Sequence, residues 1–354
     1  MTAVKIKPAK AHYYFIVKGS AIAFQISRYK AKHSLIFNST WHAHVNGTIF
    51  SCNCVTIYNG KELIFTFYNT AMKISMTGIC FSLVILMSCE QNNKRTELVL
   101  PQRQAPKTLS YQTDSAKQWL AQHANNPAHL QIALTVNRTD SAYFAKMDSV
   151  ILPVDMSGNL VFYLPFPLGV PYLRDIRKII FFSYPTQTFA AYENGVLIYT
   201  GATNMGRKKD PTPTGLFYTN WKAEETTSTF NDEWELRWNF NIENKAGIGW
   251  HQYELPGYPA SHSCLRLLET DARYLYEWAD QWVLLDDETV KVKGTPVIVF
   301  GSYGFDAPKP WLQLLTDPHA LDISKEEIEK ITTPHLTKII AEQMKREKLP
   351  ANKK

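Results

Sequence analysis

Short apolar stretches separated by turn residues dominate the chain from about residue 108 onward. Residues 188–192 and 196–199 are apolar and flank Asn194-Gly195, the strongest short signal for a hairpin of two β-strands. Many short strands with turn signals and little helix predict a mainly β core of the α+β class. Further strands are expected at residues 150–154, 159–164, 179–182, 216–218 and 297–300.

Helical patterns flank this strand-rich region. Residues 114–123 predict a short helix, whereas the apolar residues 131–136 can continue as helix or strand. After the strands, Thr270 can cap a helix over residues 271–282. The C-terminal residues show two further helix starts, a capping-box pattern at Ser324 and Glu327 and then Thr333-Pro334, which begins a helix running to about residue 348.

Residues 72–89 have the pattern of a secretory signal peptide. One Lys precedes an apolar run of about ten residues, which is too short to span a bilayer because a spanning helix needs roughly 20 residues. The run ends in Leu-Met-Ser-Cys, which resembles a bacterial lipobox. This pattern predicts lipidation of Cys89 and a membrane anchor facing the cell envelope or periplasm, with polar residues 90–107 as a tether. The alternative is a buried helix with an incidental cysteine.

Residues 1–71 differ in charge from the rest of the chain. They contain eight of the 38 Lys and Arg residues but one of the 32 Asp and Glu residues. The remaining residues are balanced in charge, which gives no support for a nucleic-acid partner. We interpret residues 1–71 as an upstream extension outside the native protein, with translation starting at Met72. The alternative is a small cytoplasmic extension.

Cys264 is isolated from the other four cysteines, which all lie in the first quarter of the chain. Structural thiols in an oxidising compartment are normally paired, so a lone cysteine there is either a buried small hydrophobe or a reactive group. His262 lies two residues before Cys264 and His251 lies thirteen before it. A thiol with imidazole neighbours is the minimum set for nucleophilic acyl transfer, because the imidazole takes the thiol proton.

These residues belong to an ordered set of motifs. The set comprises Tyr192-Glu193-Asn194-Gly195, residues 203–206, Thr212-Pro213-Thr214-Gly215, His251, the stretch 255–267 with Ser261-His262-Ser263-Cys264-Leu265-Arg266, and Gly294-Thr295-Pro296-Val297. It resembles the L,D-transpeptidase catalytic domain (YkuD-type) over about residues 187–303. The chain departs from that family in two places. Ser263 stands where the family usually has Gly, and the gap between His251 and Cys264 is shorter than in many members.

The resemblance implies a β-sandwich fold with the site in a cleft beneath a mobile loop. It implies peptidoglycan stem peptides as the partner and substrate, with no cofactor and no metal. The enzyme would form 3–3 cross-links through a cysteine thioester, whereas water as acceptor would give L,D-carboxypeptidase activity. Two alternatives stay open: a related hydrolase of wall peptides, and a catalytically weak wall-binding lipoprotein. The sequence does not determine the oligomeric state.

The resemblance also implies roles for individual residues. Cys264 is the expected nucleophile and His251 its base, with the backbone carbonyl of Gln252 orienting the imidazole. His262 is a supporting group or an alternative base. The backbone N–H groups of Ser263 and Cys264 are candidates for an oxyanion hole, which the Cβ of Ser263 can narrow. The expected substrate-binding residues are Arg266, Ser261 and Tyr253; for Arg266 the alternative is a structural ion pair.

The segments outside the motifs are assigned more coarsely. Residues 108–186 are expected to form an accessory subdomain, with a faint resemblance to LysM-type wall-binding modules as the alternative. Residues 304–354 are expected to be a helical tail, either solvated or binding a partner. The stretch 221–250 is rich in Trp and falls where the family has a substrate lid. Its tryptophans, Trp221, Trp234, Trp238 and Trp250, either pack on substrate or anchor the loop to the core.

Overall fold

The computed structural model describes residues 10–17, 20–31, 34–45, 48–58, 63–67, 98–228 and 235–349. The chain divides into two compact units, residues 1–94 and residues 95–354. The signal peptide predicted at residues 72–89, including Cys89, lies outside the described residues. None of the helices in the described ranges has the length and apolar character that a bilayer crossing requires.

The first unit contains an antiparallel sheet in which each strand pairs with the next one along the chain. The sequence analysis predicted no strands in this region. Whether residues 1–71 belong to the native protein stays a prediction. The five strands are β1 (Lys10–Val17), β2 (Ser20–Ala31), β3 (Ser34–Val45), β4 (Thr48–Tyr58) and β5 (Leu63–Phe67).

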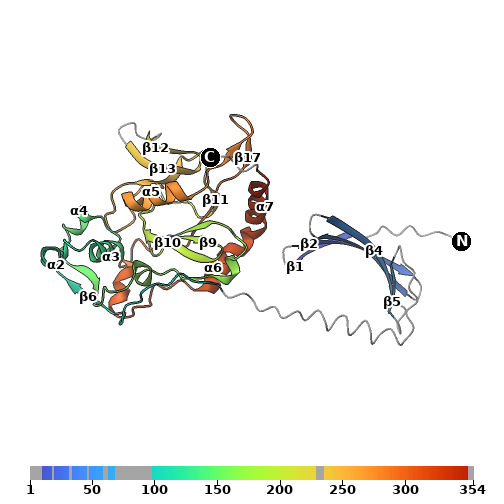
Figure 1. The fold of residues 1–354 in the computed structure, drawn as a ribbon, viewed down its shortest axis with the longest axis horizontal. Coiled ribbons are helices and arrows are strands. Elements are labelled where there is room, and N and C mark those ends of the chain that lie inside the picture. The colour runs from blue at the N-terminus through green and yellow to red at the C-terminus, as the bar shows by residue number, and fades with distance from the viewer. Residues whose placement is uncertain are drawn as a thin grey trace. The chain divides into compact units, whose positions relative to one another are not determined.

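The second unit is built around a mixed five-stranded sheet of order β10-β9-β8-β18-β11 (Figure 1). Its β8 and β18 are parallel, and apolar clusters cover both of its faces. Asn194 and Gly195 have φ of +46° and +81°, so the hairpin predicted there is confirmed. The strands are β8 (Ile179–Ser183), β9 (Thr188–Glu193), β10 (Val196–Ala202), β11 (Gly215–Tyr218) and β18 (Pro296–Phe300). Because β8 belongs to this sheet, the sheet begins before residue 187, where the resemblance to the family was expected to start.

A four-stranded sheet of order β12-β13-β14-β15 packs over the first one. The helix α5 (Glu269–Trp278) lies between the two sheets, where Ala272 and Leu275 join the core (Figure 1). Leu268 precedes α5 without a side-chain cap, so the predicted cap at Thr270 is wrong. The strands are β12 (Lys222–Thr227), β13 (Glu235–Glu243), β14 (Ile248–Gln252) and β15 (Leu265–Leu267). A separate two-stranded ribbon is formed by β16 (Val283–Leu284) and β17 (Val290–Val292).

The residues before β8 form a small α/β layer around two further apolar clusters, one of which also includes Trp311 and Leu314. The predicted helix at 114–123 is confirmed, and the ambiguous residues 131–136 are helical. The predicted strand at 159–164 is wrong: this short apolar run forms a 3₁₀ turn, because periodicity cannot distinguish the two in so few residues. The elements are β6 (Tyr111–Asp114), α2 (Ala116–His123), α3 (Pro127–Asn137), α4 (Ser141–Phe144), β7 (Val150–Pro153), η1 (Leu160–Tyr163) and η2 (Pro171–Leu173).

The described end of the predicted tether is docked on this unit. Arg103 donates to the carbonyl oxygen of Leu197 at 2.5 Å, and the N–H of Gln104 donates to Asn159 Oδ1 at 2.6 Å. These bonds fix residues 103 and 104 to the folded protein. A flexible tether can therefore extend only over residues before them.

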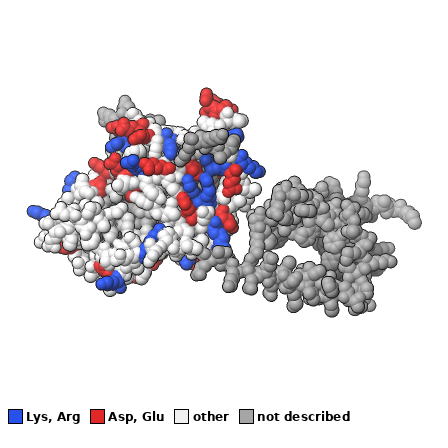
Figure 2. Space-filling view, viewed as in Figure 1, with Lys and Arg blue, Asp and Glu red and all other residues white. Residues whose placement is uncertain are grey.

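The C-terminal helices pack against the first sheet. The Ser324 hydroxyl accepts from the N–H of Glu327 at 3.0 Å, which confirms the predicted cap. Ile328 and Ile339 are buried in the core, so the expectation of a solvated appendage is wrong. Figure 2 shows Lys and Arg interspersed with Asp and Glu on this side of the unit. The elements are η3 (Pro310–Leu315), α6 (Lys325–Thr332), η4 (Thr333–His335) and α7 (Leu336–Glu347).

Candidate active site

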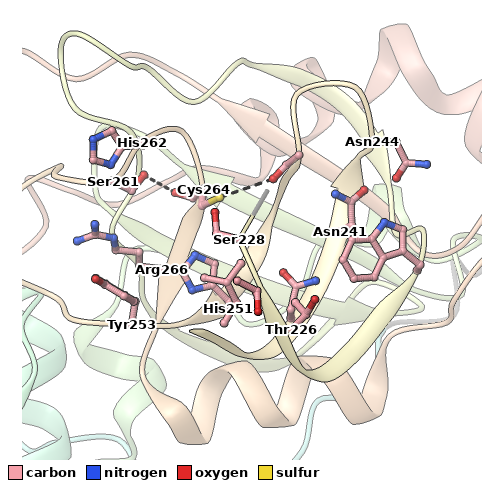
Figure 3. Close-up of a pocket in the computed structure, with 15 residues that line it drawn as sticks. Thr226, Ser228, Asn241, Asn244, His251, Tyr253, Ser261, His262, Cys264 and Arg266 are labelled. Carbon is pink, nitrogen blue, oxygen red and sulfur yellow. Dashed lines mark hydrogen bonds between the residues drawn. The ribbon is translucent and has the colours of Figure 1, made fainter. Parts of the chain in front are cut away.

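A cavity of about 220 Å³ lies between the β12–β13 hairpin, the strand β14 and the loop before β15. Within the described residues, Arg266 is the only Lys, Arg, Asp or Glu side chain in its lining, so no carboxylate opposes an anionic ligand. The lining comprises Trp221, Thr226, Thr227, Ser228, Leu236, Asn239, Asn241, Asn244, Gly247, His251, Tyr253, Ser261, His262, Cys264 and Arg266. Cys264, both candidate histidines and the three expected substrate-binding residues therefore share one cavity (Figure 3).

Cys264 is half-buried in the wall of this cavity, with its thiol free. Its sulfur lies 3.9 Å from the carbonyl oxygen of Gly247, toward the β13–β14 turn (Figure 3). Burial raises the pKa of the thiol, while the Gly249 N–H and the charge of Arg266 act in the opposite direction. The resting thiol is therefore protonated at neutral pH and needs a base before it can attack.

His251 has the environment of a neutral base. Its Nδ1 lies 2.9 Å from the carbonyl oxygen of Gln252, as the sequence analysis expected. With the Nδ1 proton donated to that carbonyl, Nε2 is left as an acceptor. Burial, helped by the charge of Arg266, lowers the pKa of His251 from 6.5 to about 4, although the Gln252 bond opposes the shift. The imidazole is therefore neutral across the physiological range.

Strand pairing places His251 near the nucleophile. The strands β14 and β15 are parallel, with His251 opposite Arg266, two residues after Cys264. Both strands are mostly buried, and Trp250 and Leu265 beneath the cavity are fully inaccessible. The pairing of these two strands, which the buried core holds in place, therefore brings together two residues that are thirteen positions apart in the sequence.

The loop before β15 is braced by its own hydroxyl groups. Ser261 donates to the carbonyl oxygen of Cys264 at 2.6 Å and is 1% exposed, so its hydroxyl is engaged within the loop. Ser263 has φ of +84°, a conformation that favours glycine. Its hydroxyl donates to the carbonyl oxygen of Asp210 at 3.3 Å. Ser263 therefore adopts a glycine-like backbone despite its Cβ.

Thr212 and Asn204 are positioning residues to which the sequence analysis assigned no role. The Thr212 hydroxyl donates to the carbonyl oxygen of Ser263 at 2.8 Å and accepts from the N–H of Gly206 at 2.8 Å. Asn204 accepts from the N–H of Ala260 at 3.1 Å, and its backbone pairs with Arg266. The Thr-Pro-x-Gly motif was the available signal for Thr212. Asn204 falls within residues 203–206 of the same motif set, which was the available signal for it.

His262 occupies a different position from His251. It is exposed at the rim, and Figure 3 shows its ring set apart from His251 and from the sulfur of Cys264. The pKa of His262 is lowered by partial desolvation and by the charges of Arg207, Arg266 and Lys209. The charge of Asp210 raises it, but by less. This placement favours the supporting role over that of the working base.

Arg266 faces the cavity and stacks on an aromatic ring. Its guanidinium lies 4.3 Å from the centroid of the Tyr253 ring, a cation–π contact. Among the described residues no carboxylate lies within ion-pair distance of it, and Glu254 acts on its charge only from farther away. The structural ion pair considered for Arg266 is thus not found, and its guanidinium remains able to bind an anion.

The tryptophans of the stretch 221–250 divide between the two expected roles. Trp238 and Trp250 are buried in the core, where they anchor the second sheet. Trp221 lines the cavity and is available to a ligand. Trp234 lies outside the described residues.

The α/β layer before β8 contacts the site through Asp140. The Asp140 carboxylate accepts from the N–H of Tyr143 and from the N–H of Leu255, each at 2.8 Å. Tyr143 also donates to Glu254 at 3.2 Å. Residues 254 and 255 directly follow Tyr253, so this layer supports the segment that holds the Arg266 partner.

A metal centre is not apparent at the site. No cluster of three or more His, Cys, Asp or Glu side chains suited to a metal ion occurs in the parts of the chain that the structure describes.

Comparison with known proteins gives the class of this domain. Residues 177–299 match the family model YkuD, L,D-transpeptidase catalytic domain. The resemblance predicted from the sequence is therefore confirmed for this part of the chain. The match starts at residue 177, which includes β8 and agrees with the sheet. No curated protein matched the chain.

Solved L,D-transpeptidase structures align with about a third of this chain. One from Stackebrandtia nassauensis is 24% identical over 36% of this chain and 57% of its own, with a TM-score of 0.30. One from Mycobacterium tuberculosis H37Rv is 21% identical over 35% and 58%, with a TM-score of 0.28. One from Enterococcus faecium is 24% identical over 35% and 49%, also at 0.28. The chain thus spans only about half of their length, and the class of the domain rests on the family match.

Proposed function

We propose that this protein is a peptidoglycan L,D-transpeptidase that works through a cysteine acyl-enzyme. The observation that supports it most is that Cys264 and a neutral, buried His251 line the same cavity. The Gln252 carbonyl holds that imidazole in the tautomer a base requires. The family match supplies the substrate class, the stem peptide of peptidoglycan.

The first half-reaction breaks a peptide bond and forms a thioester. His251 Nε2 takes the proton of Cys264, and the thiolate attacks the carbonyl of the third stem residue, a diamino acid, at its L-centre. The tetrahedral intermediate collapses when the leaving D-alanine nitrogen receives the proton from His251. D-Alanine departs with its amine, and the acyl group stays on sulfur.

The second half-reaction transfers the acyl group. A side-chain amine of a neighbouring stem gives its proton to His251 and attacks the thioester, which forms a 3–3 amide cross-link and returns the proton to the Cys264 sulfur. Water in place of the amine gives a tripeptide, the product of L,D-carboxypeptidase activity. A lowered His251 pKa suits both steps, because the base must be unprotonated at the start of each.

The loop before β15 offers donors for the negative charge that develops on the carbonyl oxygen. The N–H groups of Ser263 and Cys264 donate no hydrogen bond to a described residue. Thr212 and Ser261 fix the carbonyls of this loop, which determines where those N–H groups point. Such a preorganised pair typically accounts for several kcal/mol of barrier reduction.

Arg266 is the proposed anchor for a stem carboxylate. A guanidinium can bind a carboxylate through two parallel bonds, and the lining contains no acid to compete. Tyr253 holds the guanidinium plane by stacking, which reduces the conformational entropy lost on binding. The charge of Arg266 also acts to lower the pKa of the Cys264 thiol, so Arg266 favours both substrate binding and formation of the thiolate.

A lipid anchor at Cys89 and an envelope location complete the proposal. They are supported by the signal pattern of residues 72–89 and by the substrate class of the domain. Mass spectrometry of the mature N-terminus would show a lipidated Cys89. An unmodified N-terminus upstream of Met72 would refute both the anchor and the reassigned start.

The proposed function is tested by product analysis with tetrapeptide muropeptides. We expect release of D-alanine with formation of a 3–3 dimer, and no product with Cys264→Ala. Tripeptide without dimer would identify the related carboxypeptidase instead. An unchanged substrate bound by the protein would favour the wall-binding lipoprotein, for which the unusual backbone of Ser263 provides a reason.

A further inference from the structure

The strand β13 contains a bulge directly opposite the proposed base. In the register with β14, Arg237 faces Gln252 and Phe240 faces Trp250, so Trp238 and Asn239 together oppose His251 alone. Trp238 has φ of +54°, an uncommon conformation for a bulky residue. Bulges of this kind often lie next to active sites, where they redirect side chains.

The bulge changes which side chains reach the cavity. Strict alternation would place Leu236 and Asn239 on opposite faces of the sheet, yet both line the cavity. Trp238 and Phe240 point to the core on the other face and fix the bulge by their burial. The extra residue therefore brings Asn239 into the cavity wall.

Asn239 differs from the other amides of that wall. Asn241 accepts from Asn220 at 3.0 Å and donates to the carbonyl oxygen of Glu243 at 3.2 Å, and Asn244 accepts from Asn220 at 3.2 Å. Asn239 is 5% exposed, and its Nδ2 has no hydrogen-bond partner. An unpaired buried donor is unfavourable, and its retention calls for an explanation.

We propose that Asn239 binds a backbone carbonyl of the stem peptide beside His251, an inference that rests on the proposed function. Rotation about χ2 exchanges the amide nitrogen and oxygen, which turns the donor into the cavity when a carbonyl arrives. A neutral side-chain amide matches a peptide group, because each presents an N–H donor and a carbonyl acceptor. Arg266 lines the same cavity and binds the carboxylate, so the two residues bind different parts of the stem peptide.

The proposal predicts that activity and stability respond in opposite directions. Asn239→Leu keeps the branched shape but removes the polar atoms. We expect kcat/KM for a tetrapeptide muropeptide to fall about 3- to 10-fold, mainly through KM, because one neutral hydrogen bond is lost. The melting temperature should stay the same or rise, because the unpaired buried donor is gone. The rate of carbapenem acylation should remain within about twofold of wild type.

Asn241→Leu is the matched control, because it removes an amide that is already paired. Its melting temperature should fall. An unchanged kcat/KM for muropeptide in Asn239→Leu, with normal carbapenem acylation, would overturn this proposal and leave the proposed function standing. A parallel fall of both rates and of melting temperature would also overturn it, in favour of a structural role. Absence of any Cys264 adduct in the wild type would instead overturn the proposed function.

Discussion

The two walls of the cavity differ in whether their polar side chains have hydrogen-bond partners before a substrate binds. On the wall formed by β14 and the loop before β15, Ser261, Thr212 and His251 each have a partner that fixes them. On the wall formed by β13, the Asn239 amide has an unpaired donor, whereas a residue of positive φ occurs on both walls, Trp238 on this one and Ser263 on the other. The comparison separates a preorganised reaction centre from a recognition surface that a ligand completes.

Removal of the base should have the largest effect on the reaction wall. For His251→Gln we expect the rate of Cys264 acylation to fall by about 10² to 10⁴, because general-base assistance is lost while the buried polar shape is roughly kept. Stopped-flow measurement with a carbapenem gives this rate without any need for peptide recognition. His262→Gln is the matched comparison and should lose less than about tenfold. The reverse order would make His262 the working base.

The same histidine makes stability depend on pH. The folded pKa is about 4 and the usual value is 6.5, so below pH 6.5 the unfolded chain binds a proton that the folded one does not. The free energy of unfolding should therefore fall from pH 6.5 toward pH 4, by about 3 kcal/mol in total from this group. Urea titrations at several pH values measure it.

His251→Gln provides the reference for those titrations. Burial raises the pKa of Asp271 to about 7, which gives a slope of the opposite sign, but Asp271 is present in both proteins. The difference between wild type and His251→Gln thus isolates the histidine. Parallel curves for the two proteins would contradict the buried, neutral imidazole.

Thr212→Val tests the hydrogen bonds by which Thr212 positions the loop around Cys264. Valine has nearly the same shape but leaves the Gly206 N–H and the Ser263 carbonyl without their partner. We expect a loss of about 2 kcal/mol in stability and roughly a tenfold slower acylation, for carbapenem and muropeptide alike. An effect on muropeptide alone would place Thr212 with the recognition wall.

Ser263→Gly should have the smallest effect and the opposite sign. Glycine adopts φ of +84° without a Cβ penalty, so stability should rise by about 1 kcal/mol, net of the entropy that glycine adds to the unfolded chain. Acylation should be equal or faster. A large loss of rate, seen in the carbapenem assay, would show that the Ser263 hydroxyl has a role of its own.

The sequence alone was sufficient to predict the elements that depend on interactions between neighbouring residues. Asn194-Gly195 determines its hairpin by backbone conformation alone, and Ser324 caps its helix with its own side chain. The motif around Cys264 was equally readable, because the chemistry requires those residue types near one another. Gln252 could be named in advance since its carbonyl adjoins His251 in the chain.

Long-range contacts account for what the sequence did not reveal. The buried sides of α6 and α7 are apparent only once the first sheet is present to receive Ile328 and Ile339. Asp140 supports residues more than a hundred positions away, and no local pattern indicates this. The β13 bulge depends on a register with β14, so Asn239 could not be distinguished from its neighbouring amides.

Intact-mass analysis after incubation with a carbapenem tests the central claim most directly, because it asks whether the Cys264 sulfur is an acylating nucleophile. The account predicts one covalent adduct, mapped to Cys264 by peptide sequencing, that is absent in Cys264→Ala and slow to form in His251→Gln. An unmodified wild-type mass at neutral pH, or an adduct that persists in Cys264→Ala, would contradict it.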